Sequence, residues 1–220
     1  MVREIKKMEY AGLNGRTVVG IDVGGDRKGF HAVVLTGGKY TGHCTTKCID
    51  KLVDWCNDVK GSVIAVDAPC RWSKDGSARP AERELMDKGI WCFSTPTREG
   101  ADDHKKNHYG WMLRGMKLFE ALAPSHPLCC AFPSSSEKYC FETFPHAVTW
   151  HLRGGDADAS NKRSQRREIL KKNGVDIVKL TNIDLVVAAI CALTAHRVAT
   201  GESYLTYGDA SSGFIVVPKR

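Results

Sequence analysis

The sequence predicts an α/β fold with one mixed sheet, in which three antiparallel strands come first, parallel strands follow, and helices lie on both faces. Extended apolar runs separated by glycines come first, a segment with helical periodicity follows them, and a fourth apolar run comes next. A strand that follows a crossover helix lies parallel to an earlier strand of the same sheet. The chain has 220 residues, of which 42% are hydrophobic, and this is enough to bury one sizeable core.

The first part of the predicted sheet rests on glycine-separated apolar runs. Three runs have strand composition and hairpin order: 17–24, 30–36 and 39–46. Gly37-Gly38 separates the last two runs, and such a pair between extended segments is typical of a tight turn. Residues 49–59 then place apolar side chains at helical spacing, and residues 62–67 read as a buried strand.

The second part of the chain alternates irregular and helical segments. Residues from 68 to about 136 are rich in glycine, proline and charge, which predicts a helical insertion beside the sheet, with helices near 79–88 and 108–123. Further elements are expected in this order: a short strand at 138–144, a basic helix at 162–172 and an apolar helix at 185–199.

Two of the predicted strands carry an aspartate at their carboxyl end. Thr17-Val-Val-Gly-Ile-Asp-Val-Gly-Gly25 holds Asp22 just before two glycines, and Ser62-Val-Ile-Ala-Val-Asp67 ends on Asp67. A carboxylate at the tip of a buried strand is costly to desolvate unless it meets a cation or hydrogen-bond donors. Ligands of α/β sheets bind at the carboxyl ends of the strands. The two acids therefore predict a shared metal site, and the alternative is that each one caps a turn.

Composition narrows the class of protein. Lys and Arg number 32 against 25 Asp and Glu, and the net charge of +7 favours an anionic partner, of which nucleic acid is the first candidate. The sequence shows neither a signal peptide nor an apolar run of membrane-spanning length, so we expect a cytoplasmic protein without membrane contact. Nine cysteines without zinc-knuckle spacing favour buried free thiols. We expect a polar leader at 1–16 and one domain at 17–220.

Five segments, in a fixed order, carry a resemblance to one protein family. The segments are Gly20-Ile-Asp-Val-Gly-Gly, Ile64-Ala-Val-Asp-Ala-Pro, Ala78-Arg-Pro-Ala-Glu-Arg-Glu-Leu, Phe141-Glu-Thr-Phe-Pro-His and Ala188-Ala-Ile-Cys-Ala-Leu-Thr-Ala-His-Arg. They resemble the domain-of-unknown-function family 429, described as predicted nucleases of ribonuclease H-like fold, from about residue 17 to 218. The predicted order of strands and helices is also that of ribonuclease H-like folds.

The resemblance implies that the chain hydrolyses phosphodiester bonds of nucleic acid with Mg²⁺ or Mn²⁺ as cofactor. Such chemistry uses two divalent ions about 4 Å apart, held by acids from different elements. By resemblance Glu142, on the short strand, is a third metal ligand beside Asp22 and Asp67, and an acid at the start of the last helix is a fourth catalytic residue. Glu142 has an alternative role as the partner of a nearby arginine.

The fourth acid is the point at which this sequence departs from the family. Val187 stands where the family pattern has an acid, and Asp184 lies one turn earlier. Asp184 is therefore the candidate catalytic acid, but a residue at a helix N-terminus can also serve only as a cap. If Asp184 does not reach the metal, the site has three acids.

Basic side chains are the candidates for binding substrate, because the planar fork of arginine suits phosphate oxygens. We expect contacts from five of them: Arg79, Arg83, Arg98, Lys162 and Arg166. The alternative is that these residues lie on solvated helix faces, where Arg79 and Arg83 would form a local ion pair with Glu82. Exposed tryptophans such as Trp72 or Trp91 could stack on bases.

Two other functions compete with the nuclease hypothesis. The first is a non-catalytic module that binds nucleic acid or a protein, and the valine at the fourth acid position favours it. The second is a phosphotransferase of the actin-like and sugar-kinase class, which shares the core of the fold and the Asp-x-Gly-Gly start. That class needs two similar lobes and a second phosphate loop, which 220 residues do not easily supply.

Overall fold

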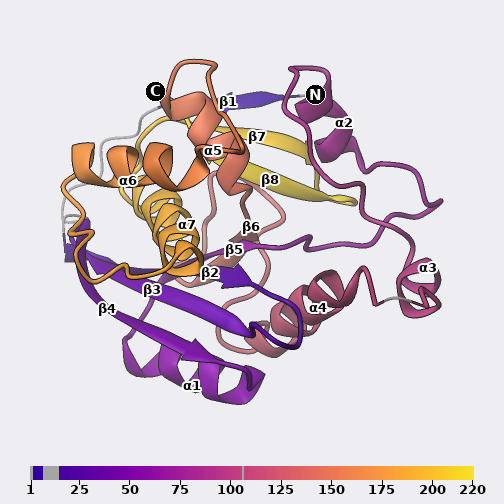
Figure 1. The fold of residues 1–220 in the computed structure, drawn as a ribbon, viewed down its shortest axis with the longest axis horizontal. Coiled ribbons are helices and arrows are strands. Elements are labelled where there is room, and N and C mark those ends of the chain that lie inside the picture. The colour runs from indigo at the N-terminus through magenta and orange to yellow at the C-terminus, as the bar shows by residue number, and fades with distance from the viewer. Residues whose placement is uncertain (1, 7–14, 106) are drawn as a thin grey trace.

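The computed structural model describes residues 2–6, 15–105 and 107–220, and these form one mixed sheet with helices on both faces (Figure 1). Within the described residues the strand order is β1-β7-β8-β6-β5-β2-β3-β4. The strands are β1 (Arg3–Ile5), β2 (Thr17–Val23), β3 (Phe30–Thr36), β4 (Lys39–Thr46), β5 (Val63–Asp67), β6 (Tyr139–Glu142), β7 (Tyr204–Asp209) and β8 (Gly213–Pro218).

The central five strands have the arrangement of a ribonuclease H-like fold, as predicted. β2, β3 and β4 pair as antiparallel neighbours, and β5 and β6 then continue the sheet in parallel from β2. Three strands were not predicted. β8 pairs in parallel with β6, β7 is antiparallel to β8, and β1, within the predicted leader, pairs with β7. The rest of that leader lies largely outside the described residues, at 7–14.

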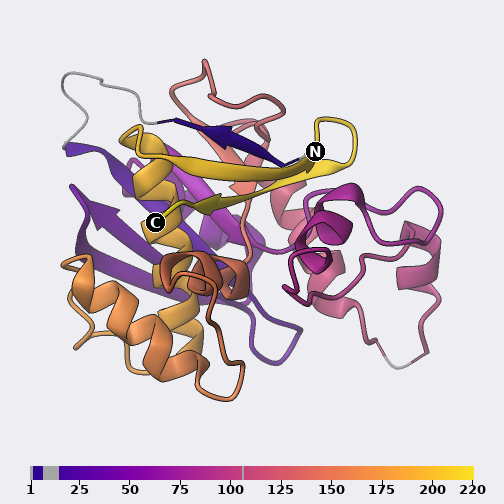
Figure 2. The same cartoon turned by 90° about the horizontal axis from the view of Figure 1, so that it is seen from above.

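The helices form two layers and one side group. They are α1 (Ile49–Asp58), α2 (Pro80–Met86), α3 (Arg98–Asp102), α4 (Gly110–Leu122), α5 (Pro145–Leu152), α6 (Lys162–Lys172) and α7 (Ile183–Ala199). α5, α6 and α7 pack on one face of the sheet, and α1 and α4 pack on the other. α2, α3 and α4 belong to the insertion at 68–136, and the part of it that carries α2 and α3 lies at one end of the sheet (Figure 2). Among the described helices, none has the length and apolarity that crossing a membrane requires.

The alternation of side chains along β2 and β5 explains which residues face α7. Val19 and Ile21 pack with the α1 and α4 layer, whereas Val18 packs with the α7 layer. Successive side chains of a strand point to opposite faces, so Gly20 and Asp22 share the face of Val18. The same alternation on β5 places Asp67 on the α7 face.

The packing of α7 on β2 is closest at Gly20. A Cβ atom at this position would lie 1.9 Å from the backbone nitrogen of Ala192 and 2.2 Å from the carbonyl oxygen of Ala188. The helix backbone therefore rests directly on the strand. Because Asp22 lies two residues beyond Gly20, and α7 begins one turn before Ala188, the helix start lies over the end of the strand that carries Asp22.

We expect Gly20→Ala to destabilise the protein by about 3 kcal/mol or more, because both atoms that the new methyl group meets belong to the helix backbone. Urea unfolding measures the change. Gly25→Ala is the matched control, since a Cβ there meets no atom within 4 Å, and it should shift stability by no more than about 0.5 kcal/mol. Equal stability of the two variants would show that α7 can retreat from β2 without cost.

Candidate metal centre

Asp22 and Asp67 lie side by side at the carboxyl ends of two parallel strands. The register of β2 and β5 pairs Asp22 directly with Asp67, so both side chains point to the face covered by α7. Both residues are partly buried. The predicted adjacency of the two strands and their acids is confirmed by this register. The sheet thus delivers two carboxylates to one place.

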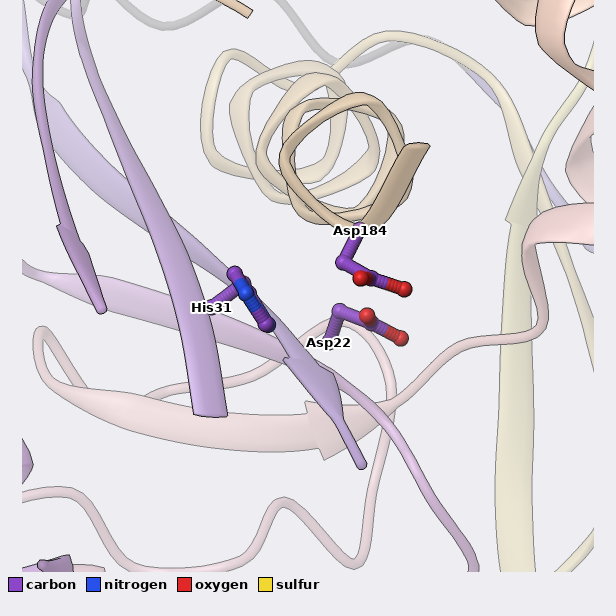
Figure 3. Close-up of side chains that lie close together, drawn as sticks. All are labelled: Asp22, His31 and Asp184. Atoms are coloured by element: carbon purple, nitrogen blue, oxygen red, sulfur yellow. The ribbon is translucent and has the colours of Figure 1, made fainter. Parts of the chain in front are cut away.

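Asp184 and His31 join Asp22 from two further elements (Figure 3). Each of the three side chains offers a ligand atom, and these atoms lie within 4.8 Å of one another. Asp184 is the second residue of α7, and it is not the cap of that helix, because the side chain of Asn182 accepts the hydrogen bond from the backbone N–H of Leu185. The Asp184 carboxylate is therefore available to reach over the end of β2.

His31 was not among the predicted site residues. It stands opposite Asp22 in the antiparallel pairing of β2 and β3, and only 6% of it is exposed. Its Nδ1 atom is buried without a hydrogen-bond partner among the described residues. Burial lowers the pKa of His31, so the imidazole is neutral near pH 7 and keeps a lone pair for a cation. The sequence indicates that a hairpin strand, β3, returns beside Asp22. Which residue of β3 stands opposite Asp22 depends on the shape of the Gly24–Gly29 turn.

Asp22 and Asp67 resist ionisation in the metal-free protein. Burial first, and then the negative charge of Asp184, raise the pKa of Asp22 to about 7. Burial and the charge of Asp22 raise the pKa of Asp67 well above its usual range. Neighbouring acids that are partly withdrawn from water favour a bound cation, which would supply the missing positive charge. The donor set of Asp22, Asp184 and His31 therefore fits a divalent metal.

Three cations border the acids. The Nζ atom of Lys28 lies 2.9 Å from Oδ1 of Asp184. Arg166 of α6 is only 6% exposed, and its Nε atom has no hydrogen-bond partner among the described residues. The charges of Arg166 and Lys162 lower the pKa of Asp22 and so oppose its desolvation. Of the five predicted substrate-binding residues, Lys162 and Arg166 are the two whose charges act on Asp22.

Glu142 meets Arg79 instead of the acids on β2 and β5. Its register partner on β5 is Val66, so its side chain lies on the opposite face from Asp67. Two nitrogens of the Arg79 guanidinium donate to the two carboxylate oxygens at 2.6 and 2.9 Å, and the backbone N–H of Cys70 donates at 2.8 Å. The alternative role as an arginine partner is therefore observed. Metal ligation by Glu142 stays a prediction.

Arg79 is buried, so the alternative of a solvated helix face does not hold for it. It precedes α2, only 2% of it is exposed, and its Nε donates to Oε1 of Glu82 at 2.8 Å. Glu82 also accepts hydrogen bonds from the backbone N–H of Arg79 and from Thr95. The three charged side chains form a network inside the protein, which ties the insertion to β6. A contact of Arg79 with substrate stays a prediction.

The remaining predicted cations lie away from the three-ligand cluster. Arg83 is exposed on α2 and donates to the carbonyl of Ala78, and Arg98 is exposed at the start of α3, 3.7 Å from Asp102. The basic helix α6 is not one uniform exposed face. Arg166 points inward, whereas Lys162 is exposed. Binding of substrate by these residues stays a prediction.

Comparisons with known proteins give a family and a distant structural likeness. The family model described as "Protein of unknown function (DUF429)" matches residues 20–212. The Thermus thermophilus RuvC structure aligns with a TM-score of 0.46 and 14% sequence identity, over 85% of this chain and 98% of that chain. No curated protein matches the sequence.

The raised pKa of Asp22 predicts a pH dependence of stability. An unfolded aspartate ionises near pH 4, but Asp22 in the folded, metal-free protein holds its proton to about pH 7. The folded state therefore binds more protons between these values, and stability falls as the pH rises from about 4 to 7. Asp22→Asn should remove part of this fall and raise the melting temperature at pH 8 in EDTA. The control is Asp50→Asn, on the exposed side of α1. Parallel pH curves for wild type and Asp22→Asn would contradict the prediction.

The buried network predicts a structural cost at Glu142. Glu142→Gln removes the charge that balances Arg79, and breaking a buried ion pair costs about 3–5 kcal/mol. We expect the melting temperature of the metal-free protein to fall by roughly 10 °C. Glu120→Gln, on the exposed side of α4, is the control. A variant that melts like the wild type in EDTA but loses its response to Mn²⁺ would show that Glu142 acts chiefly as a metal ligand.

Proposed function

We propose that this chain, which belongs to the DUF429 family, is a divalent-metal-dependent hydrolase of phosphodiester bonds in nucleic acid. The observation that carries the proposal is the convergence of three carboxylates from separate elements, Asp22, Asp67 and Asp184, with a buried imidazole beside them. Acids gathered in this way, two of them with raised pKa, favour binding of hard divalent cations. The ribonuclease H-like sheet is the scaffold that brings them together.

The ligand chemistry points to the kind of metal. Asp22 and Asp184 supply oxygen atoms, His31 supplies nitrogen, and Asp67 stands beside Asp22 for a neighbouring ion. Mg²⁺ prefers oxygen ligands alone, whereas Mn²⁺ also accepts imidazole, so the mixed set fits Mn²⁺ better. A divalent ion bound here would lower the pKa of a water molecule and stabilise the charge on the leaving oxygen.

The protein's own cations would orient the substrate. Arg166 is fixed by burial, is not held by any hydrogen bond among the described residues, and faces the acids. A guanidinium in this state can donate two parallel hydrogen bonds to a phosphate. Lys162, one turn earlier on α6, and Lys28, paired with Asp184, add positive charge at the mouth of the site. Together they would offset the repulsion between the acids and an anionic backbone.

One observation favours a non-catalytic binding module as the second candidate. Val187 is buried at the position where the family pattern has an acid, and the Asp184 carboxylate is already paired with Lys28. A module of this kind would bind metal or nucleic acid without cleaving it. The two candidates differ in turnover, which can be measured directly.

We expect the wild type to cleave a fluorophore-labelled oligonucleotide in Mn²⁺, and Asp67→Asn to lower kcat by more than about 100-fold, because the amide keeps the shape of the side chain but loses its charge. The matched control is Asp50→Asn, which should keep full activity. Mn²⁺ should also raise the melting temperature of the wild type more than that of Asp67→Asn. A metal-dependent rise in melting temperature without any cleavage would support the binding module instead.

A further inference from the structure

The insertion exposes two large aromatic side chains. Trp91 is 75% exposed and Phe93 is 68% exposed, in the segment between α2 and α3. Among the described residues, the other large hydrophobic side chain with high exposure is Val178, which lies between α6 and α7. Exposed aromatic residues that cluster on a surface mark binding sites more often than single exposed aliphatic residues do.

The exposed ring of Phe93 is held in place by neighbouring rings. It makes edge-on contacts with His108, at 6.1 Å between ring centroids, and with Trp111, at 6.5 Å. His108 in turn contacts His104 and Tyr109. Edge-on packing fixes the orientation of a ring but covers only part of its faces. Phe93 is therefore an oriented aromatic surface that remains open to solvent.

This aromatic surface reaches the end of β5, which carries Asp67, and the buried pair of Arg79 and Glu142. Phe93 and Trp111 line the same small cavity as Asp67, together with Phe144. The cavity has a volume of about 50 Å³, enough for water but too small for an aromatic ligand. A flat ligand would therefore rest on the outer rings, beside the end of β5 that carries Asp67.

We infer that the aromatic surface formed by Phe93 and Trp111 stacks on unpaired nucleobases, so that the substrate is single-stranded or locally unpaired nucleic acid. This inference rests on the proposed function and names its substrate class. Bases within a duplex are stacked on one another, and only an unpaired base offers its face to a protein ring. The nearby cations suit the backbone of such a strand, since Lys28 borders the acids and the exposed Arg98 begins α3 a few residues after Phe93.

The test is oligonucleotide binding in EDTA, which separates binding from cleavage. Fluorescence anisotropy is measured with labelled dT12 and U12 strands and with the same strands annealed to their complements. The single strands should bind more tightly than the duplexes, and Phe93→Ala should weaken single-strand binding by about 5- to 150-fold. Phe93→Trp should bind single strands as tightly as the wild type does, because it keeps a ring. Phe93→Leu, which keeps apolar bulk without a ring, should bind as weakly as Phe93→Ala. Val178→Ala is the matched control for an exposed apolar residue and should bind like the wild type.

The outcomes separate this inference from the proposed function. Tighter binding of duplexes, or unchanged binding by Phe93→Ala, would overturn the inference even if the wild type cleaves nucleic acid in Mn²⁺. Binding by Phe93→Leu at the wild-type level would show a general apolar contact, as for a protein partner, and would also overturn it. Single-strand binding that depends on Phe93, without cleavage in Mn²⁺, would support the inference and refute the hydrolase.

Discussion

The close packing of α7 on β2 is the constraint on which the candidate centre depends. The helix backbone lies against Gly20, where a side chain of any size would collide with it. This contact sets the height of α7 above the sheet and so places Asp184 over the end of the strand that bears Asp22. Because β5 pairs with β2 in register, the same contact also fixes the position of the start of α7 relative to Asp67. A glycine with no chemical role of its own therefore governs the spacing of the acids.

The centre places acidic side chains in a partly buried site, where their negative charge is unfavourable without a counterion. Burial and mutual repulsion favour the protonated forms of Asp22 and Asp67, and the nearby Arg166 and Lys28 offset this only in part. Groups with strongly shifted pKa at the edge of a sheet are a common mark of functional sites. The fold tolerates the repulsion between these acids because the rest of β2 and β5 is buried in apolar contacts on both faces.

The sequence was sufficient for the central sheet and for the pair Asp22 and Asp67, because apolar runs that end on an acid fix both the strand and the end at which the acid emerges. It was not sufficient for His31, whose position depends on the register set by a turn. It was not sufficient for the burial of Arg79 either, because helical spacing within one segment does not identify a partner on β6. The strands β7 and β8 were not predicted, although they complete the sheet.

The network of Arg79, Glu82 and Glu142 divides the insertion into two parts with different freedom to change. Cys70, Arg79 and Thr95 are all bound, directly or through Glu82, to the end of β6, so the chain between them is anchored at three points. Residues 96–105 make no hydrogen bond to a strand in the described part of the chain, and α3 within this outer stretch is short and largely exposed. Length and sequence can therefore drift in this outer stretch without disturbing the strand ends. The carboxylates at the strand ends therefore keep their positions when surface residues of this stretch change.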